Sequence, residues 1–219
     1  MTTPATSPQS LPILEAIALR TSVREFRPDP VPEELLLTLL DAANQAPSSM
    51  NVQPWEFILV TSPEAKQALS TATSGNNQNA ILTAGATFVC LGSMRQQDAL
   101  ANRLEQRWIT PDATPERIER VQRSLKRLRE DETFRKDHVL TNTYIGITQL
   151  VLAAQGLGLS SLWMGGFDAA KVKEVMGIPE DYLVASLISV GYAAQEPSVK
   201  PRDRRPLGEI AWRNHFGQR

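Results

Sequence analysis

Two serines, an asparagine and a glutamine lie between two prolines in the stretch of this chain that is best suited to hold a ligand, residues 47–55, Pro-Ser-Ser-Met-Asn-Val-Gln-Pro-Trp. Pro47 ends the preceding helical pattern because it has no N–H and clashes with the previous turn. The hydroxyls and amides that follow could contact a polar heteroaromatic ligand. The same residues are typical of a turn with local side-chain hydrogen bonds. A serine nucleophile is disfavoured, because the chain has neither a G-x-S-x-G elbow nor a histidine nearby.

A second candidate is Arg20-Thr21-Ser22-Val23-Arg24, at the end of the first predicted helix. Two guanidiniums and two hydroxyls within five residues suit a phosphate group, because arginine matches phosphate oxygens with paired N–H donors. A solvated helix end, with arginines near the negative end of the helix dipole, is an equally good interpretation.

Three further segments carry ligand-binding residue types. Residues 76–79 are four consecutive amides, residues 163–167 place two glycines after a short strand, and residues 200–207 form a basic cluster. Each is also typical of an ordinary turn or solvated tail. Gly156-Leu157-Gly158 does not make a dinucleotide site, because Ser161 replaces the third glycine and the segment follows a helix.

Length and composition restrict the possible functions. The 219 residues make one large domain or two small ones, and the net charge of −1 provides no general attraction to nucleic acid. A single cysteine, Cys90, excludes an intrachain disulfide, and two histidines show no metal-ligand spacing. Without a signal peptide or a long apolar run, we expect a soluble cytoplasmic protein that binds no membrane and no metal.

Hydrophobic periodicity predicts the elements that must position these residues. Helices are expected at 11–20, at 32–45 and after residue 62, with a polar loop at 74–79. Charged residues spaced for i,i+4 pairs predict exposed helices over 95–137, and 139–154 is apolar on all sides, which predicts a buried helix. Strands are expected at 55–60, 84–92, 161–165 and 185–192. The pattern favours an α/β or α+β three-layer domain.

Together, Arg20–Arg24 and the Pro47–Trp55 loop resemble the nitroreductase family of FMN-dependent NAD(P)H oxidoreductases, and the resemblance extends from about residue 11 to residue 207. It implies an α+β, three-layer fold with a central mixed sheet flanked by helices, in an intertwined homodimer. Residues 11–219 would form one domain after a flexible tail, 1–10. The charged helices 95–137 would cover the active site, helix 139–154 would be the main dimer contact, and 196–219 would embrace the partner subunit.

The resemblance also implies which residues bind FMN. Arg20 and Ser22 would hold the phosphate, with Thr21 between them, and Arg24 would lie near the N1–C2=O edge, where a cation stabilises reduced flavin. The remaining implied contacts come from four segments: Pro47, Ser48, Ser49 and Asn51 across the dimer interface, Asn77 or Gln78, Met164-Gly165-Gly166 near flavin N5, and Arg204 or Arg202 on the phosphate.

The implied reaction is ping-pong hydride transfer, from NADH or NADPH to flavin N5 and then to a nitroaromatic, quinone or similar small acceptor. Trp108 and Phe134 are hypothesised to shape the acceptor pocket, and packing between charged helices is an equally good interpretation. The alternatives are a specialised dehalogenating, flavin-fragmenting or azoline-oxidising member, and a flavin-binding protein without turnover. A third alternative is an interaction module that binds nucleic acid through 95–137 and the basic tail. The net charge of −1 argues against it.

Overall fold

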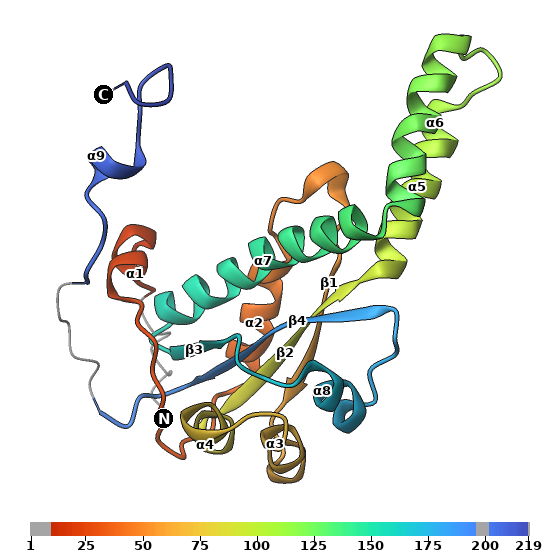
Figure 1. Ribbon diagram of the computed structural model, residues 1–219. Coiled ribbons are helices and arrows are strands. Elements are labelled where there is room, and N and C mark those ends of the chain that lie inside the picture. The colour runs from red at the N-terminus through yellow and green to blue at the C-terminus, as the bar shows by residue number, and fades with distance from the viewer. Residues whose placement is uncertain (1–9, 196–201, 219) are drawn as a thin grey trace, which may run out of the picture.

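A computed structural model describes residues 10–195 and 202–218 and contains a four-stranded sheet in the order β1-β2-β4-β3 (Figure 1). The strands are β1 (Trp55–Val60), β2 (Ala86–Ser93), β3 (Ser160–Met164) and β4 (Tyr182–Gly191). All three strand pairings are antiparallel, so the sheet is antiparallel and the prediction of a mixed sheet is wrong. The parallel pairing in the described part of the chain is the isolated bridge between Ser22 and Ser161. The predicted α+β class is confirmed.

Helices cover both faces of the sheet, which makes three layers (Figure 1). One face carries α3 (Pro63–Ser70), α4 (Gly75–Thr83) and α8 (Ala169–Met176), and the other carries α2 (Glu33–Asn44) and α7 (Glu132–Gly156). The central strand β2 is buried throughout, and its alternate residues point to opposite faces. Val89 therefore packs in the core under α3, α4 and α8, whereas Phe88 and Cys90 pack under α2 and α7.

Helix α7 is longer than the predicted 139–154 because it begins at Glu132. Asp131 follows the last residue of α6 and is the N-cap of α7. Its carboxylate accepts a hydrogen bond from the N–H of Phe134 at 2.9 Å. The prediction of burial on all sides is also wrong within one chain. Tyr144 and Ile145 are 40% and 37% exposed, although the Tyr144 hydroxyl donates to the carbonyl of Ala185 in β4 at 3.3 Å.

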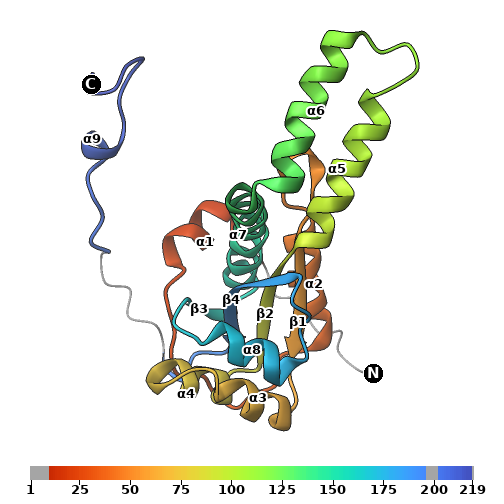
Figure 2. The ribbon, with the colours of Figure 1, turned by 45° about the vertical axis from the view of Figure 1, so that its right-hand side comes forward.

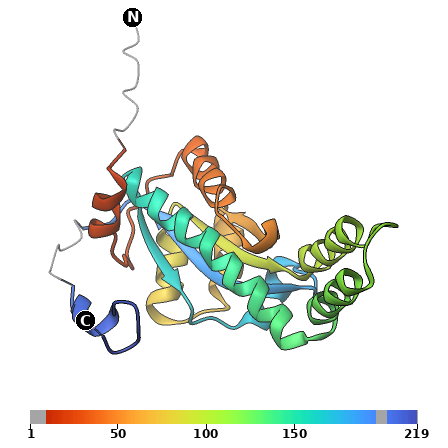
Figure 3. The same cartoon turned by 90° about the horizontal axis from the view of Figure 1, so that it is seen from above.

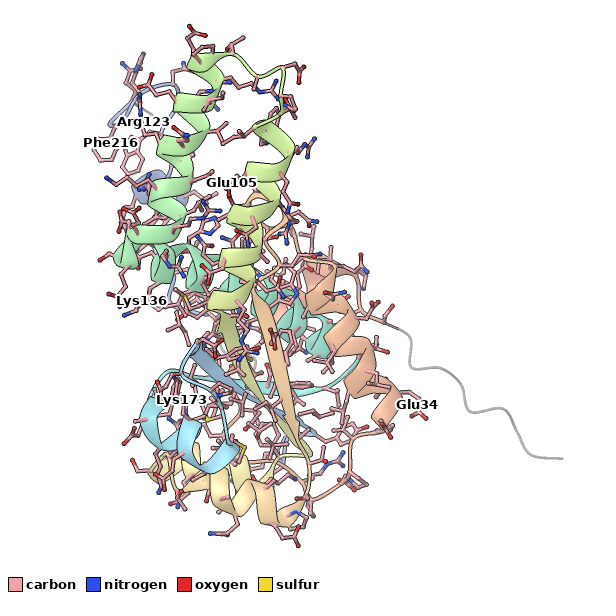
Figure 4. The ribbon with its side chains drawn as sticks, turned by 90° about the vertical axis from the view of Figure 1, so that its right-hand side faces the viewer. Glu34, Glu105, Arg123, Lys136, Lys173 and Phe216 are labelled. Carbon is pink, nitrogen blue, oxygen red and sulfur yellow. The ribbon has the colours of Figure 1, made fainter. Side chains whose placement is uncertain are left out.

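Residues 95–137 form helices, as the charge pattern predicted. Helices α5 (Met94–Trp108) and α6 (Pro115–Glu130) make a hairpin that projects beyond the sheet, and α7 begins at its base (Figure 2). Five buried side chains hold the base of the hairpin to the loop before β1: Val52, Leu100, Ala101, Leu125 and Leu128. Arg123 pairs with Glu119 and Lys136 with Glu132, each at i,i+4, and Figure 4 shows Arg123 and Lys136 on the solvent side.

The C-terminal segment lies beside the short helix α1 (Ile13–Leu19), outside the layered body (Figure 3). Helix α9 (Leu207–Ile210) and the described residues after it expose large apolar side chains, with Leu207 77% and Phe216 87% accessible. The N-terminal tail predicted at 1–10 lies almost wholly outside the described residues, as does the first part of the predicted 196–219 extension.

Candidate functional site

The Arg20–Arg24 segment lies along the free edge of β3. Ser22 forms a parallel bridge with Ser161, and the N–H of Val23 donates to the carbonyl of Ser161 at 3.0 Å. Because β3 is an edge strand, this segment extends the sheet by one short pairing. The side chains of Ser22 and Arg24 are exposed there, and Thr21 is half-buried.

The first turn of α4 brings the amide residues to the same edge. The sequence predicted a loop at residues 74–79, and this prediction is wrong because helix α4 begins at Gly75. The side-chain amide of Asn77 donates to the carbonyl of Gly166 at 3.0 Å, and that of Asn79 donates to the carbonyl of Arg24 at 3.3 Å. Gln78 is half-buried and takes part in neither bond. Asn79 was missed by the sequence reasoning, although the run of four amides contained it.

The segment that follows β3 leaves open space beside Gly165. Met164 is buried in the core, and its carbonyl accepts a hydrogen bond from the Ser186 hydroxyl at 2.8 Å. Its side chain therefore cannot contact a ligand at the surface. A Cβ built on Gly165 would meet no atom within 4 Å, whereas one on Gly166 would meet the Asn77 amide at 3.3 Å.

Three guanidiniums gather where α1 ends. Arg202 donates to the carbonyls of Ile17 at 3.3 Å and Ala18 at 2.9 Å, and also to the carbonyl of Arg20. Partial burial lowers the pKa of Arg20, and the positive charges of Arg202 and Arg204 lower it further. Arg202 is thus engaged by helix carbonyls, while Arg20 and Arg204 add positive charge beside it.

The Pro47–Trp55 loop lies away from these segments, at the start of β1 on the opposite edge of the sheet. Its centre is a short 3₁₀ turn, Ser49–Asn51, whose Ser49 N–H donates to the Asn142 side-chain oxygen at 2.7 Å. Met50 and Asn51 have left-handed backbone, with φ of 52° and 54°. Ser48 is half-buried and accepts from the N–H of Gln53 at 3.1 Å, whereas Pro47 is exposed.

A cavity of 290 Å³ lies between this loop and the hairpin. It is lined by Met50, Leu104, Trp108, Arg120, Val121, Ser124 and Leu125. Trp108 therefore lines a cavity together with Met50 of the loop, and its role in an acceptor pocket stays a hypothesis. Phe134 does not line the cavity, because it stacks on His138 with ring centroids 5.4 Å apart and packs at the base of the hairpin.

The sequence of this chain matches the model of the nitroreductase family over residues 17–192. The chain belongs to the nitroreductase family. It is 36% identical over 210 residues to the NADH dehydrogenase of Thermus thermophilus, an alignment that covers 93% of this chain and 98% of the relative. It is 31% identical over 172 residues to the oxygen-insensitive NADPH nitroreductase of Helicobacter acinonychis, with 77% and 81% covered.

Solved structures agree with this assignment. A protein from Exiguobacterium sibiricum in complex with FMN matches this chain with a TM-score of 0.75 and 26% identity, covering 94% of this chain and 99% of that chain. The relatives' names and the family together identify this protein as an oxidoreductase enzyme. Within residues 10–195 and 202–218, no helix has the length and apolar character needed to cross a membrane.

Proposed function

We propose that this nitroreductase is an FMN-dependent NAD(P)H oxidoreductase that reduces nitroaromatic, quinone or similar small acceptors. The observation that carries the proposal is the convergence of Arg20–Arg24, Asn77 and Gly165–Gly166 at the β3 edge of the sheet. These segments are far apart in sequence and combine a basic cluster, an amide and an open backbone. The FMN-bound relative supports the choice of cofactor.

The basic cluster suits the phosphate of FMN. Arg204 is close enough to Arg20 for its positive charge to lower the pKa of Arg20. A bound phosphate dianion would relieve the repulsion between the two guanidiniums. The Arg202 guanidinium donates to the carbonyls of Ile17 and Ala18 at the end of α1, so these N–H groups are not free to bind the phosphate. Of the two arginines predicted on the phosphate, this arrangement favours Arg204.

The other end of the edge suits a flat ring system. Gly165 leaves room for a ring to approach the backbone, and Asn77 holds the adjacent carbonyl of Gly166. Arg24, whose carbonyl is held by Asn79, presents a cation that would stabilise negative charge on the ring. Bound FMN would supply the redox chemistry, by accepting hydride from NADH or NADPH and passing electrons to the acceptor in a ping-pong cycle.

A second copy of the chain would complete the site. Strands about 4.8 Å apart put β1 roughly 14 Å from β3, so the Pro47–Trp55 loop cannot line the cluster of its own chain. The hairpin likewise projects away from that cluster and could cover only a partner's site (Figure 1). Tyr144 and Ile145 on α7, together with Leu207 and Phe216 in the C-terminal segment, expose apolar surface suited to an intertwined homodimer.

Absorbance spectroscopy of the purified protein tests the reaction. We expect a flavin band that bleaches on anaerobic addition of NADH or NADPH and returns when a quinone or nitroaromatic is added. Light scattering tests the assembly, with an expected mass of twice the 24.2 kDa of one chain.

The remaining outcomes separate the alternatives. A colourless protein that also fails to bind added FMN would exclude the proposed cofactor. Bound flavin that resists both nucleotides would instead indicate a specialised or non-catalytic member of the family.

A further inference from the structure

A buried carboxamide joins the Pro47–Trp55 loop to the long helix α7. The Asn142 side chain is 4% exposed, and its oxygen accepts the hydrogen bond from the Ser49 N–H at 2.7 Å. Its amide nitrogen donates to the carbonyl of His138, one turn earlier in α7, also at 2.7 Å. Both ends of the side chain are therefore used, and together they fix its orientation.

The loop that Asn142 holds has an unfavourable backbone. Met50, Asn51 and Gln53 all have φ between 46° and 54°, a conformation that residues with a Cβ rarely adopt. Such conformations persist only where surrounding contacts enforce them. The loop's own bonds, from Gln53 to the Ser48 hydroxyl and from Val52 to the Ser49 carbonyl, close the turn without fixing its place on the protein.

Contacts from outside also hold the end of the loop, where the Ser93 N–H donates to the carbonyl of Pro54 at 2.7 Å and the Trp55 indole donates to the Asn44 side-chain oxygen at 3.3 Å. Val52 is buried against the hairpin, and the Arg103 guanidinium reaches the carbonyl of Asn51 at 3.5 Å, at an exposed position. The bond from the Ser49 N–H to Asn142 is shorter than the Arg103 contact, so it is the stronger of these two polar links between the centre of the loop, Ser49–Asn51, and a helix.

We propose that Asn142 is a positioning residue, which holds Ser48, Ser49 and Asn51 in the arrangement needed to line the flavin of the partner subunit. This inference rests on the proposed function, because it assigns the loop to the partner's FMN. Asn142 itself does not contact the flavin. It acts through the Ser49 N–H, and it also ties the loop to the helix that exposes Tyr144 and Ile145.

The chemistry of the two bonds requires one acceptor and one donor on the same side chain. Leucine has the same branching and the same number of side-chain heavy atoms, and it supplies neither. An ionised aspartate would accept from Ser49 but would face the carbonyl of His138 without a proton to donate. A protonated aspartic acid supplies both groups, and burial favours this neutral form. The Asn142→Asp variant should therefore regain function as the pH falls.

The test compares Asn142→Leu and Asn142→Asp with Thr143→Val in the complete protein. Thr143 is a matched control, since it is the next residue of α7, equally buried, and its hydroxyl bonds to the carbonyl of Val139 within the helix. The readouts are the FMN dissociation constant from fluorescence quenching, KM and kcat, and hydrogen exchange of the peptide covering residues 48–54 in FMN-free protein.

We expect Asn142→Leu to raise the FMN dissociation constant about tenfold and to speed exchange of the loop, as one lost buried hydrogen bond would. Thr143→Val should change both by less than about twofold. In Asn142→Asp the dissociation constant should return toward the wild-type value as the pH is lowered, with no such trend in Thr143→Val. Tight FMN binding and unchanged loop exchange in Asn142→Leu would overturn the inference.

The experiment also separates this inference from the proposed function. A wild-type protein that binds no FMN would overturn the proposed function. Faster loop exchange in Asn142→Leu than in Thr143→Val would even then support the positioning role, because that readout needs no cofactor.

Discussion

The side-chain amide of Asn77 donates a hydrogen bond to the carbonyl of Gly166 at 3.0 Å, which joins two residues 89 positions apart. This bond fixes the first turn of α4 against the segment that leaves β3. Both residues lie beside the open space at Gly165, so their relationship shapes the face on which we propose that FMN binds.

Replacing Asn77 should weaken FMN binding. Asn77→Ala removes the bond to Gly166 and leaves that carbonyl without its side-chain donor, which we expect to raise the FMN dissociation constant about tenfold. Fluorescence quenching measures the constant. The control is Asn76→Ala, an exposed neighbour in the same turn, which should bind FMN like the wild type. Equal affinities in both variants would contradict the role of Asn77.

Replacing Arg204 should weaken the binding of FMN and leave the binding of riboflavin unchanged. If Arg204 binds the phosphate, Arg204→Gln should weaken FMN binding by about 10- to 100-fold, as expected for a hydrogen bond to a charged group. Riboflavin, which lacks the phosphate, should bind the variant and the wild type equally. Isothermal titration of apoprotein measures both ligands.

A neighbouring arginine serves as the control for Arg204. Arg205 pairs with Glu209 at 3.3 Å, so Arg205→Gln should leave both affinities unchanged. An equal loss of FMN and riboflavin affinity in Arg204→Gln would show that its effect does not depend on the phosphate.

Trp108 should affect the acceptor and leave the electron donor unaffected. Its ring lines the cavity next to Met50, with the guanidiniums of Arg107 and Arg117 about 5 Å from it. Trp108→Ala removes this apolar surface, so we expect KM for a nitroaromatic to rise about tenfold. The rate of flavin reduction by NADH in stopped-flow measurements should stay the same. Arg123→Ala, on the outside of the hairpin, is the control, and unchanged acceptor KM values in Trp108→Ala would remove the support for this role.

Acid should destabilise the native protein through His138. Burial lowers the pKa of this imidazole below its ordinary value of 6.5, so the unfolded chain binds more protons than the native protein just below that pH. The free energy of unfolding therefore falls as the pH drops from 6.5 to the native pKa, and this contribution is constant below it. His138→Gln should flatten the dependence, as measured by urea denaturation between pH 8 and pH 5. The same slope in both proteins would contradict this assignment.

Local sequence signals predicted most of the elements correctly. The strand at 55–60 has the same bounds as β1, and Ser62 caps α3 by accepting from the N–H of Ala65 at 3.2 Å. The charge pattern predicted the helices of the hairpin because i,i+4 pairs act within one helix. Where the prediction was wrong, at 74–79, polar residues typical of loops stand in the first turn of a helix.

The sequence by itself determined the α+β class, the nitroreductase resemblance and the residue types that could bind a flavin. Only the tertiary structure decided which of these residues meet: Ser22 with Ser161, Asn77 with Gly166, and Ser49 with Asn142. It also separated the Pro47–Trp55 loop from the other segments by the width of the sheet. The physical reason is that periodicity reports whether a residue is buried, whereas its partner depends on strand order and helix packing between distant parts of the chain.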